Sequence, residues 1–180
     1  MAFRNVRCLE KFIFVFFISI TSRHLSNASV EEEKTLAMIK PDGLFSNHTD
    51  AIKKVILDSG FHIFEEMITQ LNKDGASSFY AEHSSKSFFS SLIKYMTSGP
   101  VLVMVLEKEN AIADWRNLIG PTDARKAKST HPHSIRAMCG QDLEKNCVHG
   151  SDSLQSAPRE ISFFFGGTLS GTEATMHDEL

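Results

Sequence analysis

The sequence predicts an α/β fold of the α+β sandwich kind, in which a four-stranded antiparallel sheet is covered by helices. Four short apolar segments have strand-like patterns, and amphipathic helical segments separate them. Their order along the chain is β-α-β, α-α, β-α, β-α, which is typical of a split βαβ sandwich. Because the chain has 180 residues and no internal repeat, we expect a single domain.

The first half of this domain is expected to contain two strands and three helical segments. Its elements are a strand at 34–39, a helix at 50–59, a strand at 61–68, and helical segments at about 73–82 and 85–97. The first strand is a short apolar run closed by a turn at Pro41-Asp42-Gly43. The first helix has Ile52, Val55 and Ile56 on one face and ends before Gly60.

The second half is expected to contain two strands, two helices and a long loop. Its elements are a strand at 101–106, a helix at 110–119, a polar loop at 120–138, a strand at 146–149 and a helix at 152–165. Gly99-Pro100 ends the preceding helix, so the apolar run after it is the clearest strand of the chain. We expect Asp152 to cap the last helix, with Gln155 completing a capping box, and Pro158 to kink the turn that bears Glu160.

Overall composition excludes several classes of protein. With 42% hydrophobic residues, ten Gly and five Pro, the chain is neither collagen-like nor wholly disordered. Its formal net charge of -3 predicts no nucleic-acid partner.

Residues 1–28 have the pattern of a secretory signal peptide. Arg4, Arg7 and Lys11 precede an apolar run at 12–20, which is shorter than the roughly twenty residues that a membrane-spanning helix needs. We expect cleavage after Ala28, with cleavage after Ser22 as the alternative, and no stable membrane insertion. An uncleaved anchor or an amphipathic leader is the competing interpretation. Removal of 1–28 takes away a net charge of +3 and leaves -6 on the remaining chain.

The chain ends in His177-Asp178-Glu179-Leu180, which is a retrieval sequence for the endoplasmic reticulum. The preceding residues are rich in Gly and Thr, so we expect an exposed, flexible tail at 166–180. The sequence therefore predicts a domain at 29–165 that is retained in the lumen of the endoplasmic reticulum through the HDEL receptor.

That compartment permits disulfides and N-linked glycans. Cys8 lies in the predicted signal peptide, so two cysteines would remain in the domain. Cys139 and Cys147 could form a disulfide, but the apolar surroundings of Cys147 favour two buried thiols. Asn47 begins an Asn-His-Thr sequon and is a candidate glycosylation site.

Polar residues interrupt the apolar patterns at three places. Lys40 follows the first strand, His149 lies between the last strand and the last helix, and the segment 116–136 carries several cations. A neutral imidazole is a nucleophile near neutral pH, and fixed cations stabilise developing phosphate charge. Glu160, eleven residues after His149, could orient the ring. These residues indicate phosphate chemistry without choosing the reaction, and each could equally be a solvated or packing residue.

Two motifs carry a resemblance to a known family. Ile39-Lys-Pro-Asp-Gly43 together with Asn146-Cys-Val-His-Gly-Ser-Asp152 closely resembles the nucleoside diphosphate kinase family, over about 34–165. The resemblance implies a ferredoxin-like fold and a ping-pong reaction, in which His149 takes the γ-phosphoryl group of a nucleoside triphosphate and passes it to a nucleoside diphosphate. It also implies a Mg²⁺ ion that bridges the nucleotide phosphates.

The resemblance further implies roles for individual residues. Ser151 and Glu160 would orient His149, and Lys40 would contact the sugar hydroxyl and the transferring phosphate. The phosphate-binding residues would be Arg116, Thr122 and Arg136.

The remaining implied roles concern the base, the sugar and the surroundings of the site. Phe88 would stack on the base, Asn146 would hold the ribose, and Tyr80 would support the site. Stacking reads no base edge, which would explain tolerance of different nucleotides.

The chain also resembles the divergent branch of the family, whose members are often weak kinases. The segment from Gly120 to Arg136 is a few residues longer than in the common hexameric members, and a Gly-rich tail replaces the usual C-terminal extension. Two hypotheses therefore stand: an active kinase, and a nucleotide-binding or interaction module with little turnover. A luminal redox factor is disfavoured because no Cys-x-x-Cys occurs. A homo-oligomer is possible, and we expect a dimer rather than a hexamer.

Overall fold

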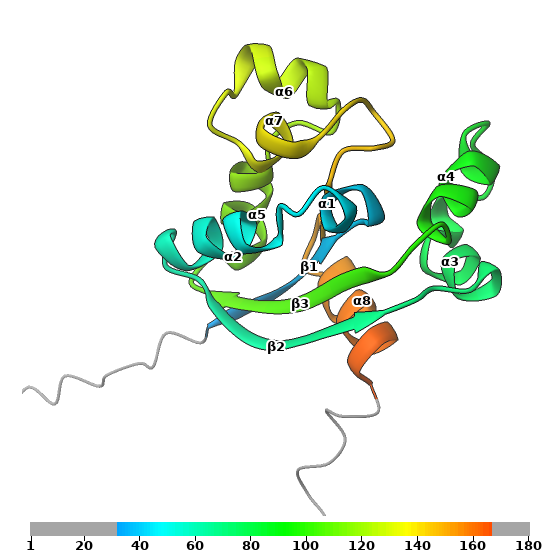
Figure 1. Ribbon diagram of the computed structural model, residues 1–180. Helices are drawn as coiled ribbons and strands as arrows, with labels where there is room; N and C mark the ends of the chain where they lie inside the picture. Colours follow the sequence, from blue (N-terminus) through cyan, green and yellow to red (C-terminus); the bar gives the residue numbers. More distant parts are fainter. Residues whose placement is uncertain (1–31, 167–180) are drawn as a thin grey trace, which may run out of the picture.

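The computed structural model describes residues 32–166, and at its centre is the expected four-stranded antiparallel sheet (Figure 1). The strands are β1 (Glu33–Ile39), β2 (His62–Thr69), β3 (Val101–Lys108) and β4 (Val148–Gly150). Their order across the sheet is β2-β3-β1-β4, and every neighbouring pair is antiparallel. The sequence-based prediction of the fold class is confirmed.

Helices cover both faces of the sheet (Figure 1). The helices are α1 (Pro41–Phe45), α2 (Thr49–Asp58), α3 (Lys73–Phe79), the 3₁₀ turn η1 (Ala81–His83), α4 (Phe89–Met96), α5 (Ala111–Ile119), α6 (Ala124–Thr130), α7 (Ile135–Cys139) and α8 (Ser156–Phe165). Leu36 and Met38 of β1 face the cluster built by α3, α4 and α8, whereas Ala37 and Ile39 face the cluster built by α2 and α5. Alternate residues of one strand thus belong to two hydrophobic cores.

The position of a strand in the sheet explains its residue pattern. β1 and β3 are central and covered on both faces, so both contain continuous buried apolar runs. β2 lies at the edge, and its residues alternate between exposed and half-buried. A register shift between Ile63 and Glu65 bends the pairing of β2 with β3.

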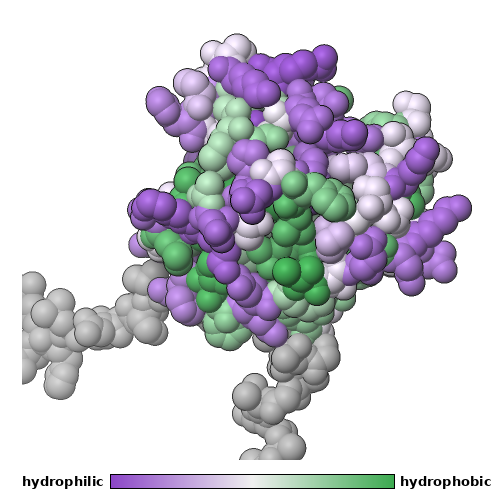
Figure 2. Space-filling view, viewed as in Figure 1, coloured by the Kyte–Doolittle hydropathy of each residue, from purple (hydrophilic) through white to green (hydrophobic). Residues whose placement is uncertain are grey.

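Two segments contain more helix than the sequence analysis expected. The predicted turn after β1 is wrong: Pro41 begins α1, where its fixed φ and missing N–H are both tolerated. The predicted polar loop at 120–138 is also wrong, because it contains α6 and α7, capped by Asp123 and Ser134. In the space-filling view, polar side chains cover the end of the molecule where α6 lies (Figure 2). Short exposed helices of this kind have no apolar stripe long enough to predict them.

The last helix begins later than predicted, and the predicted capping box is absent from it. α8 starts at Ser156, whose hydroxyl donates to the Asp152 carboxylate at 2.8 Å and accepts the backbone N–H of Asp152 and Ser153. Pro158 therefore lies in the first turn, where a missing N–H leaves no bond unmade. α8 runs unbroken to Phe165, so the predicted kink at Glu160 is wrong.

Within residues 32–166, no helix is both long and apolar enough to span a membrane. The predicted signal peptide and the HDEL tail lie outside the described residues. Asn47 is described: it is exposed in the turn after α1, with a φ of 58°.

Candidate active site

The antiparallel pairing of β1 with β4 brings together the two motifs that the sequence analysis singled out. His149 on β4 lies opposite Met38 on β1, and Lys40 directly follows β1. The Lys40 N–H donates to the Cys147 carbonyl at 2.8 Å, which joins the chain after β1 to the chain before β4. Segments more than a hundred residues apart in sequence therefore form one site.

The first part of the site, which we call the histidine end, consists of His149, Ser151 and Glu160. His149 Nε2 and Ser151 Oγ both lie 2.8 Å from Glu160 Oε2, and Ser151 Oγ also accepts the Leu36 N–H at 3.2 Å. Glu160 is buried, and burial alone would raise its pKa. The hydrogen bonds from His149 and Ser151 outweigh this effect and lower the pKa of Glu160. The carboxylate thus stays ionised and holds the Nε2 side of the imidazole.

Aromatic side chains surround the imidazole of His149. The rings of Phe79 and Tyr80 lie edge-on to it, with centroids 5.4 and 6.2 Å away. Tyr80 is buried, and its hydroxyl has no hydrogen-bond partner among residues 32–166. Further out, the His83 ring stacks on Tyr80 and contacts Phe88, whose side chain is exposed. The ring series leads from His149 to the surface at Phe88.

The second part of the site, which we call the cation end, consists of Lys40, Arg136 and Asn146, all buried. Lys40 Nζ donates to Asn146 Oδ1 at 2.8 Å, and Asn146 Nδ2 donates to the carbonyls of Thr122 and Leu143. Arg136 donates from Nη1 to the Gly120 carbonyl at 2.7 Å and from Nη2 to the Val148 carbonyl at 3.1 Å. These contacts fix both cations, yet Arg136 Nε is buried and has no hydrogen-bond partner in the described part of the chain.

The cations of this region repel one another. Burial and then the charge of Arg136 lower the pKa of Lys40 to about 8, although nearby carboxylates, Asp42 first among them, oppose this. Burial and the charge of Arg116 lower the pKa of Arg136 to about 10. Among the described residues, no carboxylate forms a salt bridge with Lys40 or Arg136. Buried cations with depressed pKa values and an unpaired donor are suited to an anionic ligand.

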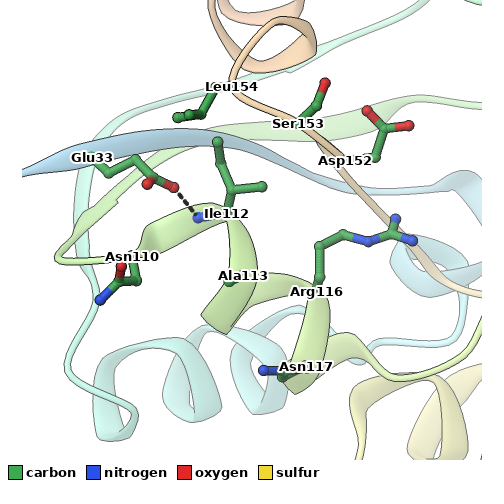
Figure 3. A pocket seen from close by; sticks show the side chains of 9 residues that line it. All are labelled: Glu33, Asn110, Ile112, Ala113, Arg116, Asn117, Asp152, Ser153 and Leu154. Carbon is green, nitrogen blue, oxygen red and sulfur yellow. Dashed lines mark hydrogen bonds between the residues drawn. The ribbon is translucent and has the colours of Figure 1, made fainter.

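Arg116 lies at the border of the site rather than inside it. Its Nη1 donates to the Gly150 carbonyl at 3.3 Å, and its side chain lines a pocket of about 490 Å³ (Figure 3). In this view Arg116 extends from α5 toward the segment that carries Asp152. The pocket is lined mostly by residues outside the site, and the Glu33 carboxylate in it already accepts the Ile112 N–H. We therefore place the chemistry at His149, beside the buried cations of the cation end, and not in this pocket.

The sequence-predicted residues fall into three groups. His149, Ser151, Glu160 and Tyr80 lie together, and so do Lys40, Arg136 and Asn146. Thr122 is exposed and meets the site through its carbonyl, and Phe88 is exposed at the far end of the ring series. Both amide protons of Asn146 are donated to backbone carbonyls, and its side-chain oxygen accepts from Lys40, which is its one side-chain partner among the described residues.

The interpretation of Cys139 and Cys147 as two free thiols is wrong. The two sulfur atoms form a disulfide, and the Cα atoms lie 5.8 Å apart. Cys147 is fully buried, as expected, but Cys139 at the end of α7 is half-buried and reaches it. A sequence separation of 8 leaves the relative position of two cysteines open, so only the packing of α7 could decide the pairing.

Three further residues of the site were missed. Asp42 accepts the Cys147 N–H at 3.0 Å and the hydroxyl of Tyr95, so it holds the chain before β4. Trp115 Nε1 donates to the His149 carbonyl at 3.2 Å, and Phe79 packs on the imidazole. In the sequence Asp42 lies two residues after Lys40, and Phe79 directly precedes Tyr80. This proximity to identified residues was the signal that could have revealed them.

The arrangement suits attack by an imidazole on a phosphorus atom. A ring held at Nε2 by a carboxylate presents Nδ1, and fixed cations nearby can neutralise phosphate oxygens. Among residues 32–166, no three His, Cys, Asp or Glu side chains are grouped so that they could hold a metal ion.

Comparisons with known proteins agree with this chemistry. The family described as nucleoside diphosphate kinase matches residues 33–169. The chain is similar to the "Probable nucleoside diphosphate kinase 5" of Arabidopsis thaliana, with 65% identity over 144 residues, 79% of this chain and 100% of that protein. It is 47% identical to the nucleoside diphosphate kinase of a Nitratiruptor species, over 74% of this chain and 95% of that one. The crystal structure of the Aquifex aeolicus nucleoside diphosphate kinase superposes with a TM-score of 0.74 at 40% identity, over 76% of this chain and 96% of that one.

Proposed function

This chain belongs to the nucleoside diphosphate kinase family and is thus a phosphotransferase that acts on nucleotides; on that premise we propose that His149 carries the phosphoryl group between them. A nucleoside triphosphate would phosphorylate His149, and a nucleoside diphosphate would then remove the phosphoryl group in a ping-pong reaction. The two half-reactions share one site, because the second is the reverse of the first with another base.

One observation carries this proposal, namely the hydrogen bond between His149 Nε2 and Glu160 Oε2. An ionised Glu160 keeps the proton on Nε2, so the lone pair is on Nδ1. In the first half-reaction Nδ1 would attack the γ-phosphorus, and the bond from that phosphorus to the β,γ-bridging oxygen would break. The diphosphate leaves with the bonding electron pair, while the Nε2 proton stays hydrogen-bonded to Glu160.

The cation end would bind the phosphates during this step. Arg136 and Lys40 would neutralise the charge on the leaving diphosphate and on the transferring group, with Arg116 and Thr122 at the rim. Mg²⁺ would arrive as part of the nucleotide complex, bound to phosphate oxygens and supplying charge neutralisation.

The remaining residues would position the nucleoside. The exposed ring of Phe88, at the end of the aromatic series from His149, would stack on the base without reading its edge. Asn146 would reach the ribose from its place beside Lys40, and the buried hydroxyl of Tyr80 would find its missing partner in the bound ligand or a water.

Phosphorylation with γ-labelled ATP tests the proposal directly. The protein should acquire acid-labile, alkali-stable label, and His149→Ala should acquire none. His62→Ala, which changes an exposed histidine of the edge strand, is the matched control and should label normally. If the wild-type protein binds nucleotide but stays unlabelled, the kinase proposal is wrong, and the alternative of a binding module with little turnover holds.

We also propose that the enzyme works in the lumen of the endoplasmic reticulum. The family match begins at residue 33, downstream of the predicted signal peptide, and a disulfide between Cys139 and Cys147 suits an oxidising compartment. Asn47 is exposed and would be open to glycosylation there. Deletion of His177–Leu180 should release the protein into the secretory flow, and unchanged retention would count against recognition by the HDEL receptor.

A further inference from the structure

We propose that the disulfide between Cys139 and Cys147 is a positioning element of the nucleotide site. It would hold Arg136 and Asn146 in place for the phosphates, so that its reduction weakens nucleotide binding and leaves phosphoryl transfer on His149 largely intact. The nucleotide as ligand rests on the proposed function above.

The connectivity of the disulfide places it between the two binding residues. Cys139 ends α7 three residues after Arg136, and Cys147 directly follows Asn146. The bond therefore ties the helix that carries the buried guanidinium to the segment that carries the partner of Lys40.

The backbone at Cys147 needs such support. Its φ is 71°, in the left-handed region that residues with a side chain rarely adopt. This conformation lets the Cys147 carbonyl accept the Lys40 N–H while the Cys147 N–H donates to Asp42. A Cβ at Gly43 would come within 2.8 Å of Cys147 Sγ, so the sulfur packs directly on the segment after β1. The disulfide and these contacts together fix a strained backbone beside Lys40.

α7 is anchored to the core by Ile135, which is buried against α2 and α5, and its link to the nucleotide site is a separate attachment. It is five residues long, and its contact with the rest of the site depends on Arg136, which donates to the Gly120 and Val148 carbonyls. A phosphate that takes hydrogen bonds from the same guanidinium competes with these carbonyls. On the side of α7 that faces the site, the disulfide is then an attachment that a nucleotide does not compete for.

The contacts that hold the imidazole of His149 do not include this bond. His149 is held by the pairing of β4 with β1 and by Glu160 on α8, and neither contact passes through α7. Loss of the disulfide should therefore change the position of Arg136 and Asn146 while the imidazole keeps its partners.

Reduction gives a direct test in the folded protein. A dithiol such as dithiothreitol supplies two electrons and two protons; the sulfur–sulfur bond breaks, Cys139 and Cys147 become thiols, and the dithiol becomes a cyclic disulfide. Cys139 is half-buried and gives the reductant access. The full chain, produced in an oxidising secretory host, would be measured before and after reduction, beside the variant Cys139→Ser with Cys147→Ser.

The expected result is a split between KM and kcat. Reduced protein and the double variant should each show a KM for nucleotide raised by roughly tenfold, as for the loss of about one well-placed hydrogen bond, with kcat nearly unchanged. Titration with the Mg²⁺ complex of ADP should give the same shift in Kd. The chain's single tryptophan, Trp115, is bonded to the His149 carbonyl and provides the fluorescence signal. The reductant should have no further effect on the double variant, which controls for Cys8.

Three results would overturn the inference. Peptide mapping of the oxidised protein could find Cys139 and Cys147 free, or KM and Kd could be equal in the oxidised and reduced forms. A bond that only stabilises the fold would instead lower apparent kcat at constant KM, because fewer molecules would be active. If the double variant does not fold, reduction of the folded wild type still decides. Failure of His149 to label would reject the kinase proposal alone, since the ADP titration measures the effect of the disulfide without turnover.

Discussion

At the histidine end, His149 and Ser151 share one ionised carboxylate, and the hydrogen-bond partners of their two side chains lie in the sheet or in α8. At the cation end, by contrast, Lys40 and Arg136 are buried beside one another, and no described residue bonds to Arg136 Nε. The polar groups of the histidine end are hydrogen-bonded without a ligand. At the cation end the burial of positive charge is unfavourable, and a bound anion would offset it. The difference separates two tasks: one end fixes the geometry of the reacting atom, and the other supplies the binding energy.

The largest effect is expected at the cation end, from Arg136→Lys. Lysine keeps the charge, but its compact ammonium cannot reproduce the planar fork whose Nη1 and Nη2 reach two separate carbonyls and whose Nε is left for a phosphate. Loss of charged hydrogen bonds worth about 1.5–3 kcal/mol should raise the KM for nucleotide roughly 10- to 150-fold. Steady-state kinetics would measure this, with thermal unfolding to verify the fold. Arg125→Lys, in the same segment but exposed and paired with Asp123, should leave KM unchanged. Equal effects of the two variants would contradict the assignment.

Glu160→Gln tests the histidine end and should have the opposite kinetic signature. A neutral amide no longer enforces the proton on Nε2, so fewer molecules present a lone pair at Nδ1. We expect the rate of His149 phosphorylation at saturating nucleotide to fall about tenfold or more, as for loss of a general orienting group, with KM nearly constant. Glu82→Gln is the matched control, because Glu82 is an exposed carboxylate that, like Glu160, lies near Arg159. If Glu160→Gln raised KM without lowering the rate, the assignment of separate tasks to the histidine end and the cation end would be wrong.

The smallest effect is a pH dependence of binding that originates at Lys40. With a pKa of about 8 in the free protein, Lys40 loses its proton as the pH rises through that value. Bound phosphate favours the charged form, so the affinity for ADP should fall above this pH, by at most about tenfold per pH unit. Titrations with ADP at a series of pH values would measure how steeply the affinity falls with pH. Lys40→Arg should flatten it, and Lys145→Arg, which changes an exposed lysine, should retain it. A wild-type affinity independent of pH would contradict the role of Lys40.

The sequence predicted the histidine end better than the cation end for a physical reason. His149 lies on a strand and Glu160 on a helix that the sequence predicts, and Ser151 directly follows that strand. The cation end depends on α6 and α7, which have only seven and five residues, begin at side-chain caps and are too short to show an apolar stripe.

The same contrast explains the individual errors. The disulfide depends on where α7 packs, and the left-handed backbone at Cys147 has no glycine or asparagine to indicate it. The position of Pro158 depended on where α8 begins, and a side-chain hydroxyl at Ser156 decided that. The apolar pattern of the sequence could not predict these features. They depend on packing, which brings together residues distant in sequence, and on capping, which fixes where a helix begins.

Transfer of the label to a second nucleotide tests the central claim most directly. Protein labelled with γ-labelled ATP would be freed of nucleotide and then mixed with unlabelled GDP. Our account predicts that the label leaves His149 and appears in GTP, in step with its loss from the protein. Label that stays on the protein, or that is released only as inorganic phosphate, would contradict the claim that His149 passes the phosphoryl group between nucleotides.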